Sequence, residues 1–173
     1  GFAERAPDRP RIALTLVDFV EIPTAMLAAA QSETAALVAR LGVDAGIRTV
    51  PPGSALDPEG LTLILMKGTA PAPLTRGVMG AVLRDTSSRV LWVYPASVAA
   101  GTRLAWAERL RWSARERERF AIAMGRVAVH EVVHLVCPWR EHDQKGLMAG
   151  LLTHSALTGS DLPLTRELRH DFT

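Results

Sequence analysis

One stretch of ten residues limits the possible folds of this chain more than any other. Residues 127–136 read VAVHEVVHLV, in which Glu131 is the only formally charged side chain. A helix that is apolar on every side belongs in a protein interior, where an unpaired carboxylate is costly. Upstream, Ser113 and Glu116 form a capping-box pattern, and Pro138 disfavours helical geometry at the residue before it. We therefore predict one long buried helix that begins at Ser113 and ends with this stretch.

The remaining sequence predicts strands and two further helices around that helix. We expect strands at 11–20, 46–51, 61–66, 77–84 and 89–94, and helices at 24–41 and 163–171. The apolar run 61–66 is typical of a central strand buried on both faces, whereas the glycines in 77–84 favour an edge strand. Pro163 fits the first turn of the last helix. This order of elements predicts a mixed sheet with helices packed on it, in the α/β (α+β) class.

Length and composition favour one globular domain. We expect a loose polar leader at 1–10 and a single domain at 11–173, with no membrane-spanning segment. The net charge of +2 is too small to indicate nucleic-acid binding, and the arginines at 103–119 alternate with glutamates as on a solvated helix face. Cys137 is the only cysteine, which excludes an intramolecular disulfide. Because the chain begins at Gly1 and not at methionine, the sequence leaves the cellular location open.

The predicted buried helix carries an H-E-x-x-H pattern. His130 and His134 are four residues apart, so their imidazoles project from one helix face and can hold one zinc ion. Glu131 lies roughly 100° around the helix from His130, where it can take a proton from a water at the metal. A nearby cation would also explain a buried carboxylate. The alternative interpretation is two hydrogen-bonded core histidines and an ion-paired glutamate.

A catalytic zinc site generally has three protein ligands and one open position, so a third ligand is required. The candidates after the helix motif are Cys137, His142, Asp143 and Glu167, the last with Asp171 in a Glu-x-x-x-Asp pattern. Cys137 would share the helix face of the two histidines, although a small buried residue at a helix end is an equally good interpretation. We interpret His154 and His170 as ordinary polar histidines.

Residues 130–148 resemble the metzincin metallopeptidases, whose signature is H-E-x-x-H-x-x-G-x-x-H followed by a methionine-containing turn. Two positions depart from that pattern: Cys137 replaces the glycine, and Arg140 stands where the third histidine is expected. The resemblance implies that His142, two residues later, is the third ligand. It also implies that Met148, within the sequence GLMA, forms a hydrophobic floor beneath the metal.

The resemblance further implies a fold and a function. The fold would be a mostly parallel twisted sheet with an antiparallel edge strand, a backing helix, an active-site helix and a short C-terminal helix. The function would be that of a zinc metallopeptidase with one catalytic Zn²⁺ and Glu131 as general base. A peptide or protein substrate would bind as an extended strand along 77–84. Trp139 is by default a packing residue, but Trp139 and Arg140 are also candidates to line the cleft, because they lie in the loop that must approach the metal. The alternative is a metal-binding domain without turnover, which is either degenerate or has its open position filled by a fourth protein ligand such as Cys137.

Overall fold

A five-stranded mixed sheet forms the base of the molecule in the computed structural model, which describes residues 9–70, 77–83, 88–160 and 162–172. Its strands are β1 (Arg11–Asp18), β2 (Asp44–Val50), β3 (Leu61–Leu65), β4 (Gly80–Val82) and β5 (Val90–Val93). The spatial order is β2-β1-β3-β5-β4, with all pairs parallel except β4 with β5. The predicted fold class, with its antiparallel edge strand, is therefore confirmed. Most of the expected leader, 1–10, lies outside the described residues.

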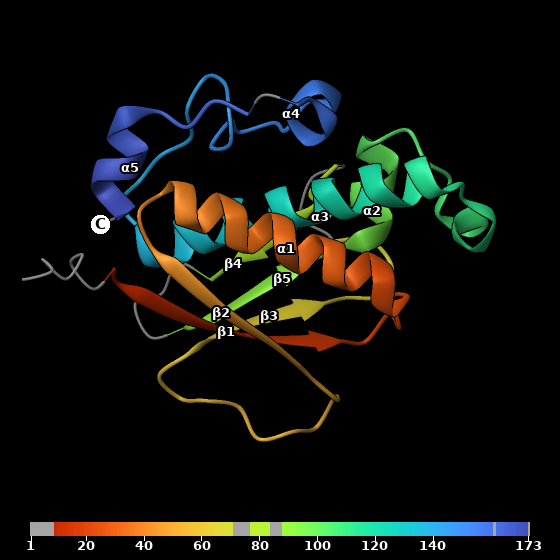
Figure 1. The fold of residues 1–173 in the computed structure, drawn as a ribbon, viewed down its shortest axis with the longest axis horizontal. Coiled ribbons are helices and arrows are strands. Elements are labelled where there is room, and N and C mark those ends of the chain that lie inside the picture. Colours follow the sequence, from red (N-terminus) through yellow and green to blue (C-terminus); the bar gives the residue numbers. More distant parts are fainter. Residues whose placement is uncertain (1–8, 71–76, 84–87, 161, 173) are drawn as a thin grey trace, which may run out of the picture.

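Two long helices cover one side of this sheet. Their bounds, with those of the shorter helices, are α1 (Thr24–Arg40), α2 (Pro95–Gly101), the 3-10 helix η1 (Trp106–Arg111), α3 (Ala114–Val136), α4 (His154–Thr158) and α5 (Arg166–Phe172). Figure 1 shows α1 and α3 side by side on the same side of the strands. Because β4 and β5 also contact α3, the antiparallel edge of the sheet lies next to the helix that carries the histidine motif.

Helix α3 begins as its capping box predicts. The Ser113 backbone N–H donates to the Glu116 carboxylate at 2.8 Å, and the Glu116 N–H donates to Ser113 Oγ at 3.3 Å. The prediction for the last helix is wrong by three residues, because α5 begins at Arg166 and leaves Pro163 outside. There the Thr165 hydroxyl accepts a hydrogen bond from the Leu168 N–H at 3.1 Å, so a threonine cap fixes the start.

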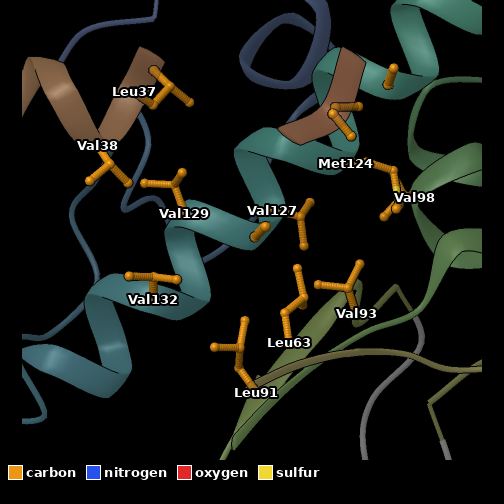
Figure 2. Close-up of a cluster of buried hydrophobic side chains, with 14 of the residues drawn as sticks. Leu37, Val38, Leu63, Leu91, Val93, Val98, Met124, Val127, Val129 and Val132 are labelled. Atoms are coloured by element: carbon orange, nitrogen blue, oxygen red, sulfur yellow. The ribbon is translucent and has the colours of Figure 1, made fainter. Parts of the chain in front are cut away.

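The core lies where α3 meets the sheet and α1. Figure 2 shows valines of α3 between side chains of β3 and β5 on one side and of α1 on the other. Val129 and Val132 of α3, like Leu91 and Val93 of β5, have no exposed surface. Burial on every side explains why this part of α3 is apolar all round, as predicted. It also makes α3 a rigid support for its histidines.

Three local predictions need correction. The expected strand 77–84 is shorter, with β4 confined to Gly80–Val82, and residue 84 lies outside the described residues. Ile64 of the central strand β3 is half-buried and not fully buried. The short helices α2, η1 and α4 were not predicted, since five to seven residues are too few to display a helical hydrophobic period. No helix among the described residues combines the length and apolar character needed to cross a bilayer.

Candidate active site

Three imidazoles meet at the C-terminal half of α3. His130 and His134 face each other one turn apart, with their Nε2 atoms 3.2 Å apart. His142 comes from the loop after the helix, and its Nε2 lies 3.0 Å from His134 Nε2. The candidate ligand atoms of all three lie within 4.8 Å of one another. The structure therefore brings together the three residues that the sequence analysis selected as metal ligands.

The geometry of these nitrogens fits one zinc ion. Zn–N bonds of 2.0–2.1 Å in a tetrahedral arrangement place neighbouring nitrogens roughly 3.3 Å apart, close to the observed 3.0 and 3.2 Å. The Leu147 carbonyl lies 2.8 Å from His130 Nδ1, and a carbonyl can only accept, so this nitrogen carries the proton. The other ring nitrogen, Nε2, is then unprotonated, as zinc ligation requires, and this atom lies 3.2 Å from His134 Nε2.

Burial keeps His130 neutral. The pKa of His130 is lowered to about 4, chiefly by desolvation and to a smaller extent by the nearby His142, while the hydrogen bond to the Leu147 carbonyl acts in the opposite direction. A neutral imidazole can donate a lone pair to a metal, whereas an imidazolium cannot. The chemistry of the three histidines therefore agrees with their spacing.

The carboxylate of Glu131 lies against the edge strand. A Cβ atom placed on Gly80 would be 2.6 Å from both Glu131 Cγ and Glu131 Oε1, which is far inside normal contact. Glu131 is only 7% exposed, although it carries a polar carboxyl group. The glycine in β4 thus provides the space in which the carboxylate sits beside the histidines. Sequence reasoning missed this role, but a glycine inside a strand is a known signal of close approach.

A cavity of about 380 Å³ joins these groups. The lining includes residues 77–82 around β4, residues 149–152, and the site residues His130, Glu131, His134 and His142. Because β4 is an edge strand, its outer side can pair with an extended chain that enters the cavity. The arrangement therefore combines a possible metal position, a carboxylate and a strand edge in one cleft.

The alternative third ligands lie elsewhere or are engaged by other groups. The Cys137 thiol is buried and donates to the Asp171 carbonyl at 3.3 Å. The Asp143 carboxylate accepts two hydrogen bonds from Arg140. Glu167 is exposed on α5. None of the three belongs to the group of close metal-ligating atoms found among the described residues.

Met148 occupies the turn that the sequence analysis selected. The Ala149 N–H donates to the Gly146 carbonyl at 3.3 Å, and Gly146 adopts a φ of +83°, which favours glycine. Met148 is fully buried in the hydrophobic core. The expectation that Trp139 and Arg140 line the cleft is wrong. Trp139 is 68% exposed outside the cavity, and the Arg140 side chain points to Asp143 and Asp171.

The architecture is similar to that of two solved structures. Archaemetzincin from Methanopyrus kandleri gives a TM-score of 0.63 at 15% identity, over 94% of this chain and 93% of its own. A zinc-dependent peptidase from Methanocorpusculum labreanum gives 0.65 at 12% identity, over 92% and 100%. The fold is archaemetzincin-like. The chain matches no protein-family model, and no curated protein is significantly similar to it in sequence.

The contact of Gly80 with Glu131 leads to a prediction. In Gly80→Ala the new Cβ must displace the Glu131 side chain, because the two would otherwise overlap. For a reaction in which the Glu131 carboxylate takes part, we expect kcat to fall by on the order of 10²-fold, since a misplacement of about 1 Å can have this effect. The affinity of the three histidines for a zinc ion should not change. Steady-state kinetics and a zinc competition titration measure the two effects.

A matched control is Gly46→Ala in β2, another strand glycine whose added Cβ would meet only the end of the Arg11 side chain. This variant should keep full activity. If Gly80→Ala were as active as Gly46→Ala, the Glu131 carboxylate would not depend on the space at Gly80.

Proposed function

We propose that this chain is a zinc-dependent metallopeptidase of the metzincin type, with residues 11–173 as one catalytic domain. The observation that carries the proposal is the convergence of three imidazole nitrogens beside Glu131 in a cleft bordered by an edge strand. The similarity in fold to a zinc-dependent peptidase supports it. If these were ordinary hydrogen-bonded core histidines, nothing would require three of their ring nitrogens to converge next to a carboxylate.

The ion would be held by His130, His134 and His142. Met148 would support the loop that carries His142 from below. Bound zinc would polarise the substrate carbonyl and lower the pKa of a water molecule. Three protein ligands are typical of catalytic zinc, whereas structural zinc has four. Cys137 contacts Asp171 and lies away from the three histidines. This supports a metal with an open fourth coordination position over a site in which the thiol blocks that position.

The other residues would orient the substrate and move the proton. The outer edge of β4 would pair with an extended peptide in antiparallel orientation and place one peptide bond beside Glu131. Glu131 would accept a proton from the water as the water oxygen bonds to the carbonyl carbon, and would return that proton to the leaving nitrogen as the C–N bond breaks. Because it is the single carboxylate among the described residues that line the cavity, it would act as both general base and general acid.

Metal removal tests the proposal directly. The purified protein should bind one zinc per chain by elemental analysis and should cleave members of a broad peptide library. A chelator should abolish cleavage, and added zinc should restore it. Bound zinc with no cleavage of any peptide would favour the second candidate, a metal-binding domain without turnover. The absence of zinc binding would contradict both.

A further inference from the structure

The loop after α3 supplies two separate elements of the proposed metal site. His142 contributes a ring nitrogen, and the Leu147 carbonyl orients His130 through the hydrogen bond at 2.8 Å. His142 is exposed, whereas His130 and His134 are 7% and 4% exposed and are fixed on a buried helix. The geometry of the three nitrogens therefore depends on what holds residues 142–147 in place.

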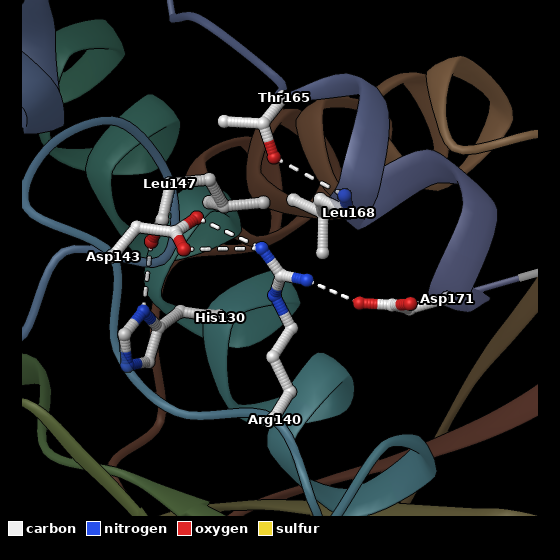
Figure 3. Close-up of polar contacts among 7 residues, drawn as sticks. All are labelled: His130, Arg140, Asp143, Leu147, Thr165, Leu168 and Asp171. Atoms are coloured by element: carbon white, nitrogen blue, oxygen red, sulfur yellow. Dashed lines mark hydrogen bonds and ion pairs between the residues drawn. The ribbon is translucent and has the colours of Figure 1, made fainter.

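Arg140 holds this loop at its start. Its Nη2 donates to both carboxylate oxygens of Asp143, at 3.1 and 3.0 Å, and its Nη1 donates to the Asp171 carboxylate. Figure 3 shows the guanidinium between these two acids, with the bond from His130 to Leu147 on the same loop. The Arg140 side chain is only 9% exposed and those of Asp143 and Asp171 are 28% and 30% exposed, so both ion pairs are partly shielded from solvent.

Because Arg140 holds Asp143, the loop is restrained on both sides of Asp143. This residue directly follows His142, so the backbone of the third histidine is fixed at its C-terminal side. The Asp143 N–H donates to the Met148 carbonyl at 2.7 Å, and Asp143 forms a bridge with Ala149. These bonds close the turn that carries the Leu147 carbonyl. Fixing Asp143 therefore restrains both His142 and the carbonyl that orients His130.

Helix α5 provides a stable anchor for the other end of the Arg140 side chain. Leu168 and Phe172 of α5 are 1% and 6% exposed, and the Cys137 thiol donates to the Asp171 carbonyl. These contacts attach α5 to the end of α3 without the ion pair. The planar guanidinium can bind both oxygens of Asp143 while it reaches Asp171, whereas the single ammonium of a lysine cannot reproduce that geometry.

We propose that Arg140 is a positioning residue for the metal site, which acts through Asp143 to hold His142 and the Leu147 carbonyl in their ligating geometry. This inference rests on the proposed zinc site. It gives a role to the arginine that stands where the resemblance leads one to expect a histidine. A purely structural ion pair would affect the free energy of unfolding but not the affinity of the folded protein for zinc.

The test is the zinc affinity of folded, zinc-free variants, measured by competition with a chromophoric chelator. Asp143→Asn and Arg140→Met should each weaken zinc binding by about 10–100-fold, the usual cost of losing a partner that orients a ligand. Arg140→Lys should recover part of the loss. The matched control is Glu33→Gln, which breaks the ion pair with Arg126 of α3 at 3.0 Å, with side chains 7% and 22% exposed. It should lower stability and leave zinc affinity unchanged.

Each outcome decides the inference. Wild-type zinc affinity in folded Asp143→Asn would overturn the inference. An equal loss of zinc affinity in Glu33→Gln would also overturn it. If Arg140→Met does not fold, the result for Asp143→Asn alone is sufficient for the test. In a His142→Ala background, Asp143→Asn should cost less than in the wild type, and an undiminished cost would contradict the route through His142. Zinc binding without peptide cleavage by the wild type would overturn the proposed function but not this inference. Absence of zinc binding by the wild type would overturn both.

Discussion

Replacement of Glu131 by glutamine should leave zinc binding intact and remove nearly all peptide cleavage. The amide has the shape of the carboxylate but cannot accept and return a proton, and general acid–base catalysis contributes about 10²–10⁴-fold to rate. The substitution is nearly isosteric, so the approach of this side chain to Gly80 is retained. We therefore expect kcat/KM to fall by about 10²–10⁴-fold, measured with a peptide that the wild-type protein cleaves.

The control is Glu141→Gln, which changes an exposed glutamate next to His142 by the same chemistry. It should retain wild-type activity and zinc affinity. Full activity in Glu131→Gln would contradict the mechanism, because no other carboxylate lines the cavity among the described residues. Loss of zinc in that variant would instead place the Glu131 carboxylate among the ligands.

Removal of one imidazole should have the largest effect on zinc binding. His134 lies between the other two, with its Nε2 at 3.2 and 3.0 Å from theirs. Alanine at this position removes a direct ligand, so the affinity should fall by more than the roughly 10–100-fold that loss of an orienting partner costs. His142→Ala should also weaken binding strongly. Isothermal titration of the zinc-free proteins with zinc gives both affinities.

Two controls accompany these variants. His154→Ala removes a histidine on α4 whose Nδ1 lies 3.4 Å from the Gly101 carbonyl and which lies outside the cavity. Cys137→Ser tests the alternative ligand and keeps a group that can donate to the Asp171 carbonyl. Both should bind zinc as the wild type does. Weakened binding in Cys137→Ser alone would reinstate the thiol as a ligand.

The parts of the fold that were predictable from the sequence are those with strong local signals. The capping box at Ser113 and the apolar run 127–136 determine α3 without reference to other segments. The strand 61–66 was likewise predicted at the centre of the sheet, and β3 lies there. Where the local sequence signal was weak, the predicted bounds of the element were less accurate. Helix α5 begins at a threonine cap and not at Pro163, because a side-chain hydrogen bond outweighs the preference of proline for a first turn.

The helical part of the site was predictable from geometry, whereas the loop residue His142 was selected only through the resemblance to a known family. His130, Glu131 and His134 occupy one helix, so their relative positions follow from helical geometry. Cys137 was expected on the same face, but it is the C-cap residue, with φ −118° and ψ 68°, so its side chain leaves that face. The loop that carries His142 is joined through Arg140 to Asp171, thirty-one residues further along the chain. Such long-range contacts leave no local pattern in a single sequence.

The central claim is that one metal ion binds where three imidazoles meet. A crystal structure of the zinc-loaded protein, with anomalous data collected on both sides of the zinc absorption edge, tests it most directly. We expect one anomalous peak per chain at about 2.0–2.1 Å from the Nε2 atoms of His130, His134 and His142, with no fourth protein ligand. A peak at Cys137 or Glu167, or none near the three histidines, would contradict the account.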